Sequence, residues 1–413
     1  MKKLVALLLA LTLCIGLCAC GAQTETPAAT EAPTEETPVA GETLSKIKVG
    51  FVFLHDENST YDLNFINAAK AAAEQLGLTD DQVMMKTNIA ESQACYDAAA
   101  ELVDAGCDLI ITDSFGHESF ALAAAKDFPE VQFVSCTGVK AHTEGLSNFH
   151  NAFASIYEGR YLAGIAAGLK LNEMIENGDI TAEEAKMGYV GAFPYAEVKS
   201  GYTSFFLGAR SVCPSVTMEV TFTSSWYDEA LEKEAANRLI NNGCVLISQH
   251  ADSMGAPTAC EAAGVPNVSY NGSTVSACPN TFIVSSRIDW TPFFVHAITS
   301  VANGEALGYD WTGTLATGSV VLTEINENAA AAGTAEKIAE VTKALEDGTV
   351  KVFDTANFTV NGETVTTYLA DVDDLGDYVG ETEVIENGEF LESYYRSAPY
   401  FDLDIDGITN LDA

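Results

Sequence analysis

Residues 99–111 (AAELVDAGCDLII) and residues 235–247 (AANRLINNGCVLI) are two versions of one pattern. In both, an amphipathic helix ends at a glycine, which is followed by a cysteine and then by an apolar strand. The two cysteines, at positions 107 and 244, are 137 apart, and a second match, residues 49–52 (VGFV) with 187–190 (MGYV), has an offset of 138. Two separated matches in nearly one register predict a chain that repeats one order of strands and helices in two lobes.

Apolar runs alternate with helical patterns throughout the first copy. The runs typical of strands are residues 47–54, 83–87, 109–112 and 131–136, and the helical patterns between them are 65–76, 92–105 and 119–128. Strands that alternate with helices pair in parallel and carry helices on both faces of the sheet. The sequence therefore predicts an α/β protein with two Rossmann-like lobes, each a parallel sheet flanked by helices, joined by a hinge.

The first 45 residues differ in composition from the rest. Residues 1–19 contain a basic start and an apolar run too short to span a bilayer in the mature protein, which is typical of a secretion signal. The run ends at Cys20 in a pattern that resembles a bacterial lipobox, so we expect Cys20 to be lipidated. An ordinary cleavage site beside an incidental cysteine is the alternative. The Thr-, Glu-, Pro- and Ala-rich residues 20–45 offer little apolar surface to bury, which predicts a flexible tether.

The rest of the chain is expected to contain the two lobes and a C-terminal part. We predict lobe 1 over residues 46–154, lobe 2 over 155–285, a return to lobe 1 with the hinge over about 286–325, and a C-terminal helix, hairpin and acidic tail over 326–413. The hairpin is indicated by Asn361-Gly362, a pair that readily adopts the positive φ angles of a tight turn.

The net charge of −39 limits what the chain can bind. Nucleic acids and anionic membrane surfaces require a basic footprint, so we expect neither as a partner, and the lipid on Cys20 is the expected membrane contact. The seven cysteines after Cys20 are odd in number and form no C-x-x-C pair. They are therefore expected to be small buried hydrophobic residues, with at least one free thiol.

No motif in the sequence indicates catalysis. There is no G-x-S-x-G elbow, no phosphate-binding glycine loop and no cluster of metal ligands, so we expect no enzyme, no cofactor and no metal. His250 and Asp252 are spaced like two metal ligands, but no third His or Cys lies at a suitable spacing. The alternative is a hydrolase on a two-lobed scaffold that uses Asp113 or His250, which would need a nucleophile and an orienting group beside its base.

Polar and aromatic residues follow the predicted strands. Ligands of open parallel sheets bind beyond the carboxyl ends of the strands, so two facing lobes would line a cleft with these residues. The candidates for ligand binding are Tyr61, Asp62, Asn64, Asp113, Ser114 and Phe115 in the first copy, and Phe193, Trp226, Gln249, His250, Asp252, Tyr270 and Asn271 in the second. Aromatic rings could stack on a planar ligand while polar side chains bind its edge. Tyr61 could instead be packed in its loop, Asp62 or Asn64 could cap the helix, and Trp226 could be structural.

Several of these residues lie in motifs that resemble those of the basic membrane protein family of lipoproteins. The matching stretches are Tyr61-Asp62-x-Asn64, Tyr157-Glu158-Gly159-x-Tyr161-Leu162-Ala163-Gly164, Gly188-Tyr-Val-Gly191-x-x-Pro194-x-x-Glu197-Val198, Ser225-Trp226-x-Asp228 and Tyr270-Asn271-Gly272. The resemblance covers about residues 46–320. It implies the type I periplasmic-binding-protein fold and an extracytoplasmic solute-binding lipoprotein of an ABC importer. Such a protein, which we expect to be a monomer, binds a purine nucleoside and delivers it to a permease in the cell membrane.

The resemblance also implies roles for individual residues. In the family an aromatic pair holds the base, so Tyr61 would be a stacking partner, Asp62 and Asn64 would bind the purine edge, and Asn271 would replace an acidic residue that holds the ribose. The loop QHADS at residues 249–253 puts bulkier groups where the family usually has a glycine-rich segment. A free nucleobase or another planar heterocycle therefore stays open beside a nucleoside. So does a receptor that reports a sugar or another small solute to a membrane sensor.

Overall fold

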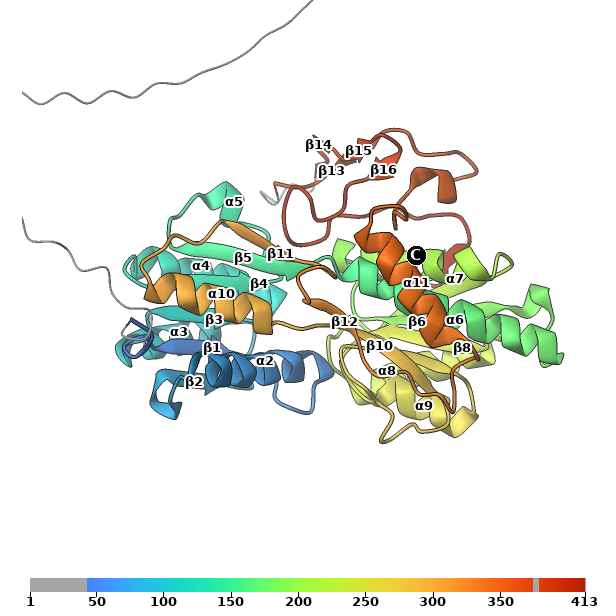
Figure 1. Cartoon of the computed structure of the whole chain (residues 1–413), viewed down its shortest axis with the longest axis horizontal. Helices are drawn as coiled ribbons and strands as arrows, with labels where there is room; N and C mark the ends of the chain where they lie inside the picture. The colour runs from blue at the N-terminus through green and yellow to red at the C-terminus, as the bar shows by residue number, and fades with distance from the viewer. Residues whose placement is uncertain (1–42, 374–378, 413) are drawn as a thin grey trace, which may run out of the picture. The chain divides into compact units, whose positions relative to one another are not determined.

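The computed structural model describes residues 43–373 and 379–412, and these residues form two large β-sheets covered by helices (Figure 1). The predicted secretion signal, Cys20 and most of the predicted tether lie outside the described residues. In the part of the chain that is described, no helix combines the length and the apolar character needed to cross a bilayer.

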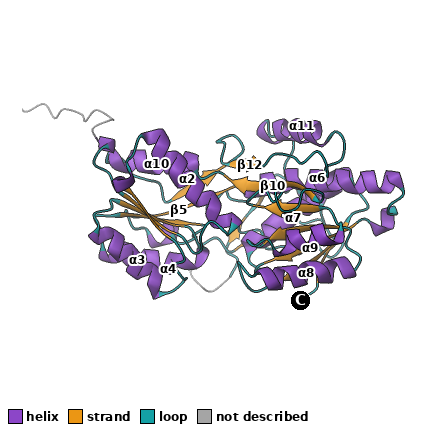
Figure 2. Cartoon of the chain, turned by 90° about the horizontal axis from the view of Figure 1, so that it is seen from below, coloured by secondary structure: helices purple, strands orange, loops and turns teal. Residues whose placement is uncertain are grey.

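The first sheet is fully parallel and has the strand order β11-β5-β4-β3-β1-β2. Its strands are β1 (Val49–Val52), β2 (Val83–Lys86), β3 (Leu109–Thr112), β4 (Gln132–Cys136), β5 (Phe149–Ala154) and β11 (Asp310–Gly313). Helices cover both faces: α2 (Thr60–Leu76) and α10 (Thr291–Ala302) on one, α3 (Gln93–Asp104) and α4 (Glu118–Asp127) on the other, with α5 (Ala141–Glu144) between β4 and β5 (Figure 2). Strands β1 and β3 are buried along their whole length, which explains their continuous apolar sequences.

The second sheet has the strand order β12-β10-β9-β8-β6-β7-β17. Its strands are β6 (Lys186–Gly191), β7 (Thr217–Phe222), β8 (Leu246–His250), β9 (Asn267–Tyr270), β10 (Phe282–Ile288), β12 (Val320–Leu322) and β17 (Ile408–Asn410). All pairs are parallel except β10 with β12. The helices are α6 (Ile156–Asn177) and α7 (Ala196–Val212), which pack together, α8 (Glu229–Asn241) and α9 (Gly255–Ala263), which form a second pair, and α11 (Thr334–Glu346), which packs on α6. Below, lobe 1 and lobe 2 denote the first and the second sheet with their helices.

The two lobes repeat the predicted order around their central strands. Strand β1 lies between β2 and β3, and β6 lies between β7 and β8. Gly50 in β1 lies under Leu102 of α3, the helix before β3, and Gly188 in β6 lies under Leu239 of α8, the helix before β8. A Cβ on Gly50 would be 2.7 Å from Leu102 Cδ1, and a Cβ on Gly188 would be 2.9 Å from Leu239 Cβ. The glycines let α3 and α8 approach their sheets in the same way, which confirms the predicted repeat.

The helix after β1 begins earlier than predicted. The apolar periodicity placed its start at residue 65, but α2 begins at Thr60 because the Ser59 hydroxyl accepts a hydrogen bond from the Asp62 backbone N–H and caps the helix. The polar residues of this first turn carry no periodicity that marks them as helical. Ser59 is therefore the N-cap, and the alternative that Asp62 or Asn64 caps the helix is wrong.

Three connections join the lobes within the described residues. The chain passes from β5 to α6, from β10 to α10 and from β11 to β12. The segment 286–325 is thus shared, because α10 and β11 belong to lobe 1 whereas the end of β10 and β12 belong to lobe 2. We propose these three connections as the hinge and keep residues 46–154 and 155–285 as the proposed main parts of the lobes.

The C-terminal segment completes lobe 2. Strand β17 pairs in parallel with β7 at the edge of the sheet, and Asp412 accepts hydrogen bonds from Thr221 Oγ1 at 2.6 Å and from the Phe222 backbone N–H at 2.8 Å. The sequence predicts only an acidic tail here, since this short polar strand has no alternating apolar pattern. The predicted turn at Asn361-Gly362 is present, with φ angles of 53° and 81° and an isolated antiparallel bridge around it.

The seven cysteines from Cys95 to Cys278 are all buried, as the sequence predicted, and all are free thiols.

Candidate ligand-binding pocket

Residues from both lobes line one pocket near the carboxyl ends of the parallel strands. The lining residues are Leu54, Tyr61, Asp62, Ser114, Phe115 and Thr137 of lobe 1, and Glu197, Trp226, His250, Asp252 and Tyr270 of lobe 2. The pocket contains about 370 Å³ of space between protein atoms, part of it open to solvent, but the centre of a water molecule can reach only about 20 Å³. The two walls therefore lie close together, and the pocket is a narrow slot.

Asp62 is the main polar group of the lobe 1 wall. Its carboxylate accepts hydrogen bonds from the His55 backbone N–H at 2.7 Å and from the Ser59 hydroxyl at 2.6 Å. Burial alone would raise the pKa of Asp62, but hydrogen bonds from His55, Asp113 and Ser59 together hold it below the ordinary value. Asp62 is therefore an ionised, fixed hydrogen-bond acceptor at neutral pH.

Asp113 lies behind Asp62, at the end of β3. It is fully buried, and its Oδ1 accepts a hydrogen bond from the Leu54 backbone N–H at 3.0 Å. Burial, and next the charge of Asp62, raise the pKa of Asp113 well above its ordinary value. The opposite directions of the two shifts place the proton of this pair on Asp113, the partner that supports ionised Asp62. The Asp113 backbone carbonyl accepts a hydrogen bond from Tyr61 Oη at 2.6 Å, which fixes the Tyr61 ring in the pocket wall.

Asp252 lies on the lobe 2 wall, two residues after the end of β8. Its carbonyl accepts a hydrogen bond from the Thr60 backbone N–H at 3.1 Å, and its own N–H donates to the Trp226 carbonyl at 3.0 Å. The first of these bonds links the two lobes at the start of α2. Burial, and next the charge of Asp62, raise the pKa of the Asp252 carboxyl well above its ordinary value. The raised pKa favours the protonated form of Asp252, which can donate a hydrogen bond opposite the ionised Asp62.

His250 fills the floor of the pocket in lobe 2. Its Nε2 lies 3.4 Å from Glu197 Oε1, and its ring centroid lies 4.5 Å from that of Tyr270. Burial lowers the pKa of His250, although the hydrogen bond with Glu197 opposes this, so the imidazole is neutral at pH 7.

Arg160, on α6, supports this floor from below. The guanidinium carbon lies 5.0 Å from the centroid of the Tyr270 ring, and Nη2 donates to Tyr189 Oη and Ser248 Oγ, each at 2.9 Å. Arg160 is fully buried, and in the described part of the chain no carboxylate forms an ion pair with it. The buried charge is held by hydrogen bonds and aromatic faces alone.

Aromatic side chains from both lobes cluster beside the slot. Trp226 lies 5.1 Å from Phe193 and 6.1 Å from Tyr195, centroid to centroid, and Phe115 of lobe 1 lies 5.7 Å from Tyr195. Trp226 and Phe115 line the pocket, so they present apolar surface to a ligand next to the carboxyl groups.

Eight of the thirteen candidate residues line the pocket: Tyr61, Asp62, Ser114, Phe115, Trp226, His250, Asp252 and Tyr270. The other five do not line it. Asn64 and Asn271 contact each other across the lobes, with Asn64 Nδ2 donating to Asn271 Oδ1 at 3.4 Å. Asp113 lies behind Asp62, Phe193 behind Trp226, and the Gln249 amide donates to the Ala251 and Ser253 carbonyls within its own loop.

Three lining residues were not among the candidates. Leu54 ends the first predicted strand run, and Glu197 stands in the Pro194-x-x-Glu197 motif, where the first turn of α7 brings it to the pocket. Thr137 directly follows β4. The rule that ligands bind after strand ends would have found Thr137 if it had been applied to every strand of lobe 1.

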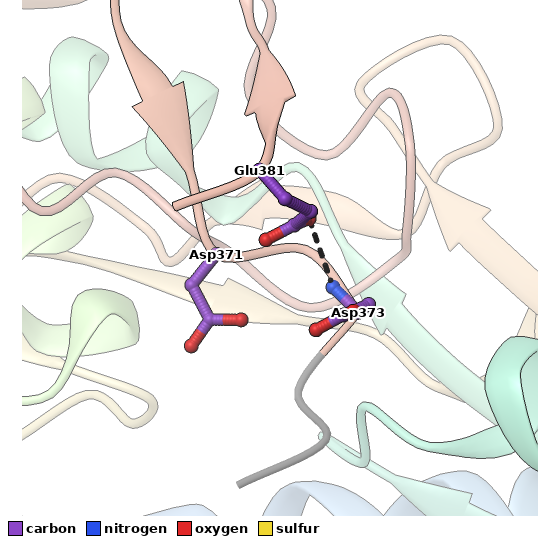
Figure 3. A group of neighbouring side chains, drawn as sticks. All are labelled: Asp371, Asp373 and Glu381. Carbon is purple, nitrogen blue, oxygen red and sulfur yellow. Dashed lines mark hydrogen bonds between the residues drawn. The ribbon is translucent and has the colours of Figure 1, made fainter. Parts of the chain in front are cut away.

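A second cluster of acidic side chains lies in the C-terminal part, away from the pocket. Oxygen atoms of Asp371, Asp373 and Glu381 lie within 4.8 Å of one another (Figure 3). Glu381 Oε1 already accepts hydrogen bonds from the backbone N–H groups of Val372 and Asp373, at 2.9 and 3.2 Å. We assign no function to this cluster.

Comparison with known families identifies the kind of protein. A sequence model of the Bmp family, described as ABC transporter substrate-binding protein PnrA-like, matches residues 56–352. The chain belongs to the Bmp family. Bmp-family proteins are solute-binding proteins rather than enzymes, and they act on the extracytoplasmic side of the membrane, where they bind small molecules and deliver them to a permease.

Two relatives are about equally similar to this Bmp-family chain. A purine-binding protein of Brucella abortus is 31% identical over 262 residues, which cover 63% of the chain and 70% of that protein. TsgA13 of Haloferax volcanii, provisionally named an ABC transporter glucose-binding protein, is 30% identical over 299 residues, which cover 70% of the chain and 69% of that protein.

Solved structures share the fold of the Bmp-family chain. An ABC transporter solute-binding protein from Aeropyrum pernix has a TM-score of 0.61 at 18% identity, covering 77% of the chain and 94% of its own. One from Conexibacter woesei has a TM-score of 0.59 at 19% identity, covering 74% and 98%. These likenesses confirm the predicted two-lobed α/β fold of periplasmic solute-binding proteins.

Proposed function

We propose that this protein captures a purine in the interlobe pocket and delivers it to an ABC permease. The observation that carries the proposal is the composition of the pocket, which combines the aromatic surfaces of Tyr61 and Trp226 with the ionised acceptor Asp62 and the neutral donor Asp252. A purine offers a flat ring to stack, N–H groups for a carboxylate and ring nitrogens for a donor. The Brucella relative is named for purine binding, which supports this ligand class.

The space and the charge of the pocket favour a free nucleobase. The slot is narrow, and His250 and Asp252 occupy its lobe 2 side, so a base fits with less opening of the lobes than a nucleoside does. Among the described residues that line the pocket, none is Lys or Arg, and a phosphate would face Asp62 without a cation. Nucleotides are therefore excluded by charge.

Binding is coupled to closure of the lobes. Besides the bond from Thr60 to Asp252, the His55 ring lies 5.5 Å from the Tyr227 ring, and Asn64 contacts Asn271. All of these contacts join lobe 1 to lobe 2. A ligand that touches both walls stabilises the closed arrangement by its preference for it over the open one.

The site of action follows from the N-terminal sequence. We propose that Cys20 carries a lipid that anchors a monomeric protein to the outer face of the cell membrane, with residues 21–45 as the tether. The anchor is tested by metabolic labelling with a radioactive fatty acid in wild type and in a Cys20→Ala variant. Label that persists in the variant would contradict the assignment.

Ligand identity is tested by thermal shift and calorimetry with the purified protein. The panel contains adenine, guanine, hypoxanthine, their nucleosides, AMP, uracil and glucose. A ligand at 100 times its Kd adds about 2.7 kcal/mol to the stability, which is easily measured. We expect purine bases to stabilise most and AMP not at all. A response to glucose alone would favour the function for which TsgA13 is named, and chemical conversion of any purine would contradict a transport role.

A further inference from the structure

Thr137 of lobe 1 and Asn271 of lobe 2 occupy the same position in the repeat. Thr137 follows β4 and donates its backbone N–H to the Ala152 carbonyl of β5 at 2.8 Å. Asn271 follows β9 and donates its N–H to the Ser286 carbonyl of β10 at 2.9 Å. Both residues have a left-handed backbone, with φ angles of 64° and 65°. The two lobes therefore present one equivalent residue each at the strand ends that face the interlobe space.

The backbone of Thr137 is unfavourable for its side chain. A β-branched residue at positive φ is an outlier, because its Cβ substituents crowd the backbone, whereas asparagine tolerates this region. The neighbouring Gly138 does not relieve the strain. A Cβ at Gly138 would lie 2.2 Å from Asn151 Nδ2 and 2.5 Å from Glu118 Oε1, so the glycine is needed there for packing. Backbone strain of this kind collects at functional sites.

The hydroxyl of Thr137 has no partner in the described residues. Thr137 is 3% exposed, lines the pocket, and its Oγ1 is buried without a hydrogen bond. Asn271 Nδ2 is likewise buried without a partner. An unsatisfied buried hydroxyl destabilises the protein on its own, but it gains a hydrogen bond when a ligand fills the slot.

We propose that Thr137 is a ligand-contacting residue that sets specificity, and that its hydroxyl hydrogen-bonds the bound solute from lobe 1. The proposal rests on the proposed function in that the ligand occupies this pocket. A hydroxyl both donates and accepts, so Thr137 can pair with a ring nitrogen or an N–H group of a purine next to the acceptor Asp62. The strained backbone and the unpaired hydroxyl of Thr137 destabilise the ligand-free protein. This destabilisation is tolerated because the hydroxyl binds the ligand.

Three substitutions separate this role from a structural one. Thr137→Val keeps the shape and the β-branch but removes the hydroxyl, Thr137→Ser keeps the hydroxyl, and Thr137→Gly removes the strain with the side chain. Ser393→Gly is the matched control. Ser393 also has a positive φ, 57°, and a buried hydroxyl without a partner, but it lies in the C-terminal segment and does not line the pocket.

The affinity for adenine and the melting temperature without ligand are measured for each variant. We expect Thr137→Val to weaken binding about five- to tenfold at an unchanged or higher melting temperature, Thr137→Ser to restore most of the affinity, and Thr137→Gly to bind weakly although it melts higher than wild type. Ser393→Gly should change stability alone.

Equal affinity of Thr137→Val and wild type overturns the proposal, as does a melting temperature that falls in step with affinity in all three variants. If wild type binds glucose and no purine, the proposed function fails while the role of Thr137 does not, and the same variants are titrated with glucose under the same criteria.

Discussion

Replacement of Glu232 by glutamine should remove a pH dependence from the stability of lobe 2. Glu232 is a fully buried residue of α8, and its Oε1 accepts hydrogen bonds from the backbone N–H groups of Asp228 and Ser253, each at 3.2 Å. The second bond holds the loop that carries Asp252 into the pocket. Burial raises the pKa of Glu232 from the ordinary value of 4.5 to about 7.

The sign of the effect follows from proton linkage. Between about pH 4.5 and 7 the folded protein retains a proton on Glu232 that the unfolded chain has released. The free energy of unfolding therefore decreases as the pH rises through this window. At about 1.36 kcal/mol for each pKa unit, the full change amounts to about 3 kcal/mol. Glutamine has no proton to lose and keeps an acceptor for the two N–H groups, so the variant lacks this contribution.

Urea unfolding followed by tryptophan fluorescence at pH 5, 6, 7 and 8 measures the difference. Relative to Glu232→Gln, wild type should lose roughly 2 to 3 kcal/mol from pH 5 to pH 8. Glu234→Gln, at an exposed position of the same helix, changes the charge equally and should follow wild type. If the curves of wild type and Glu232→Gln run parallel, the carboxyl does not stay protonated and the reasoning is refuted.

Three further substitutions or probes test the buried polar groups. Arg160→Met should cost about 3 kcal/mol or more in urea unfolding, because it leaves the hydroxyls and carbonyls around the guanidinium without donors, and a loss below about 1 kcal/mol would contradict this. Asp113→Asn should leave the adenine affinity at pH 7 nearly unchanged, because the Asp113 carboxyl is protonated. Asp62→Asn should weaken adenine binding more than about tenfold, because it removes the ionised acceptor. Equal effects of the two substitutions would be inconsistent with a single proton held on Asp113. The seven buried thiols should react with a disulfide reagent only after unfolding, because they are inaccessible and, as for Cys95, burial raises the thiol pKa to about 12. Rapid labelling of the native protein would be evidence against their burial.

The fold was predictable because each lobe is encoded by local patterns that occur twice. A Gly-Cys pair comes before both β3 and β8, and a glycine in both β1 and β6 packs under a leucine. This repeat can be recognised within the single sequence. Strand β17 was not predictable. Its three residues are stabilised by pairing with β7, whose paired residues lie 190 positions earlier in the sequence, and no local pattern indicates such a partner.

The pocket was predictable to the extent that parallel strands direct their following residues to one edge. This rule located Asp62, Trp226 and Asp252, which line the pocket. The rule could not distinguish a residue that lines the slot from one that lies behind it. Asp113 and Gln249 were therefore included, although neither lines the pocket: Asp113 binds the Leu54 N–H, and Gln249 binds a carbonyl of its own loop. Packing between the two lobes decides which side chain of a loop reaches the cavity. The local sequence of one strand and the loop after it contains no information about that packing.

The position of β17 has a consequence for how the chain folds during synthesis. Lobe 1 has all its strands once β11 has left the ribosome at Gly313, whereas the sheet of lobe 2 still awaits Ile408–Asn410. Until then β7 is an open edge, whose free N–H and C=O groups can pair with a strand of another molecule. The strands of the first lobe are therefore complete about 95 residues before those of the second. A chain whose synthesis stops between these points would expose β7 as an edge that can start aggregation.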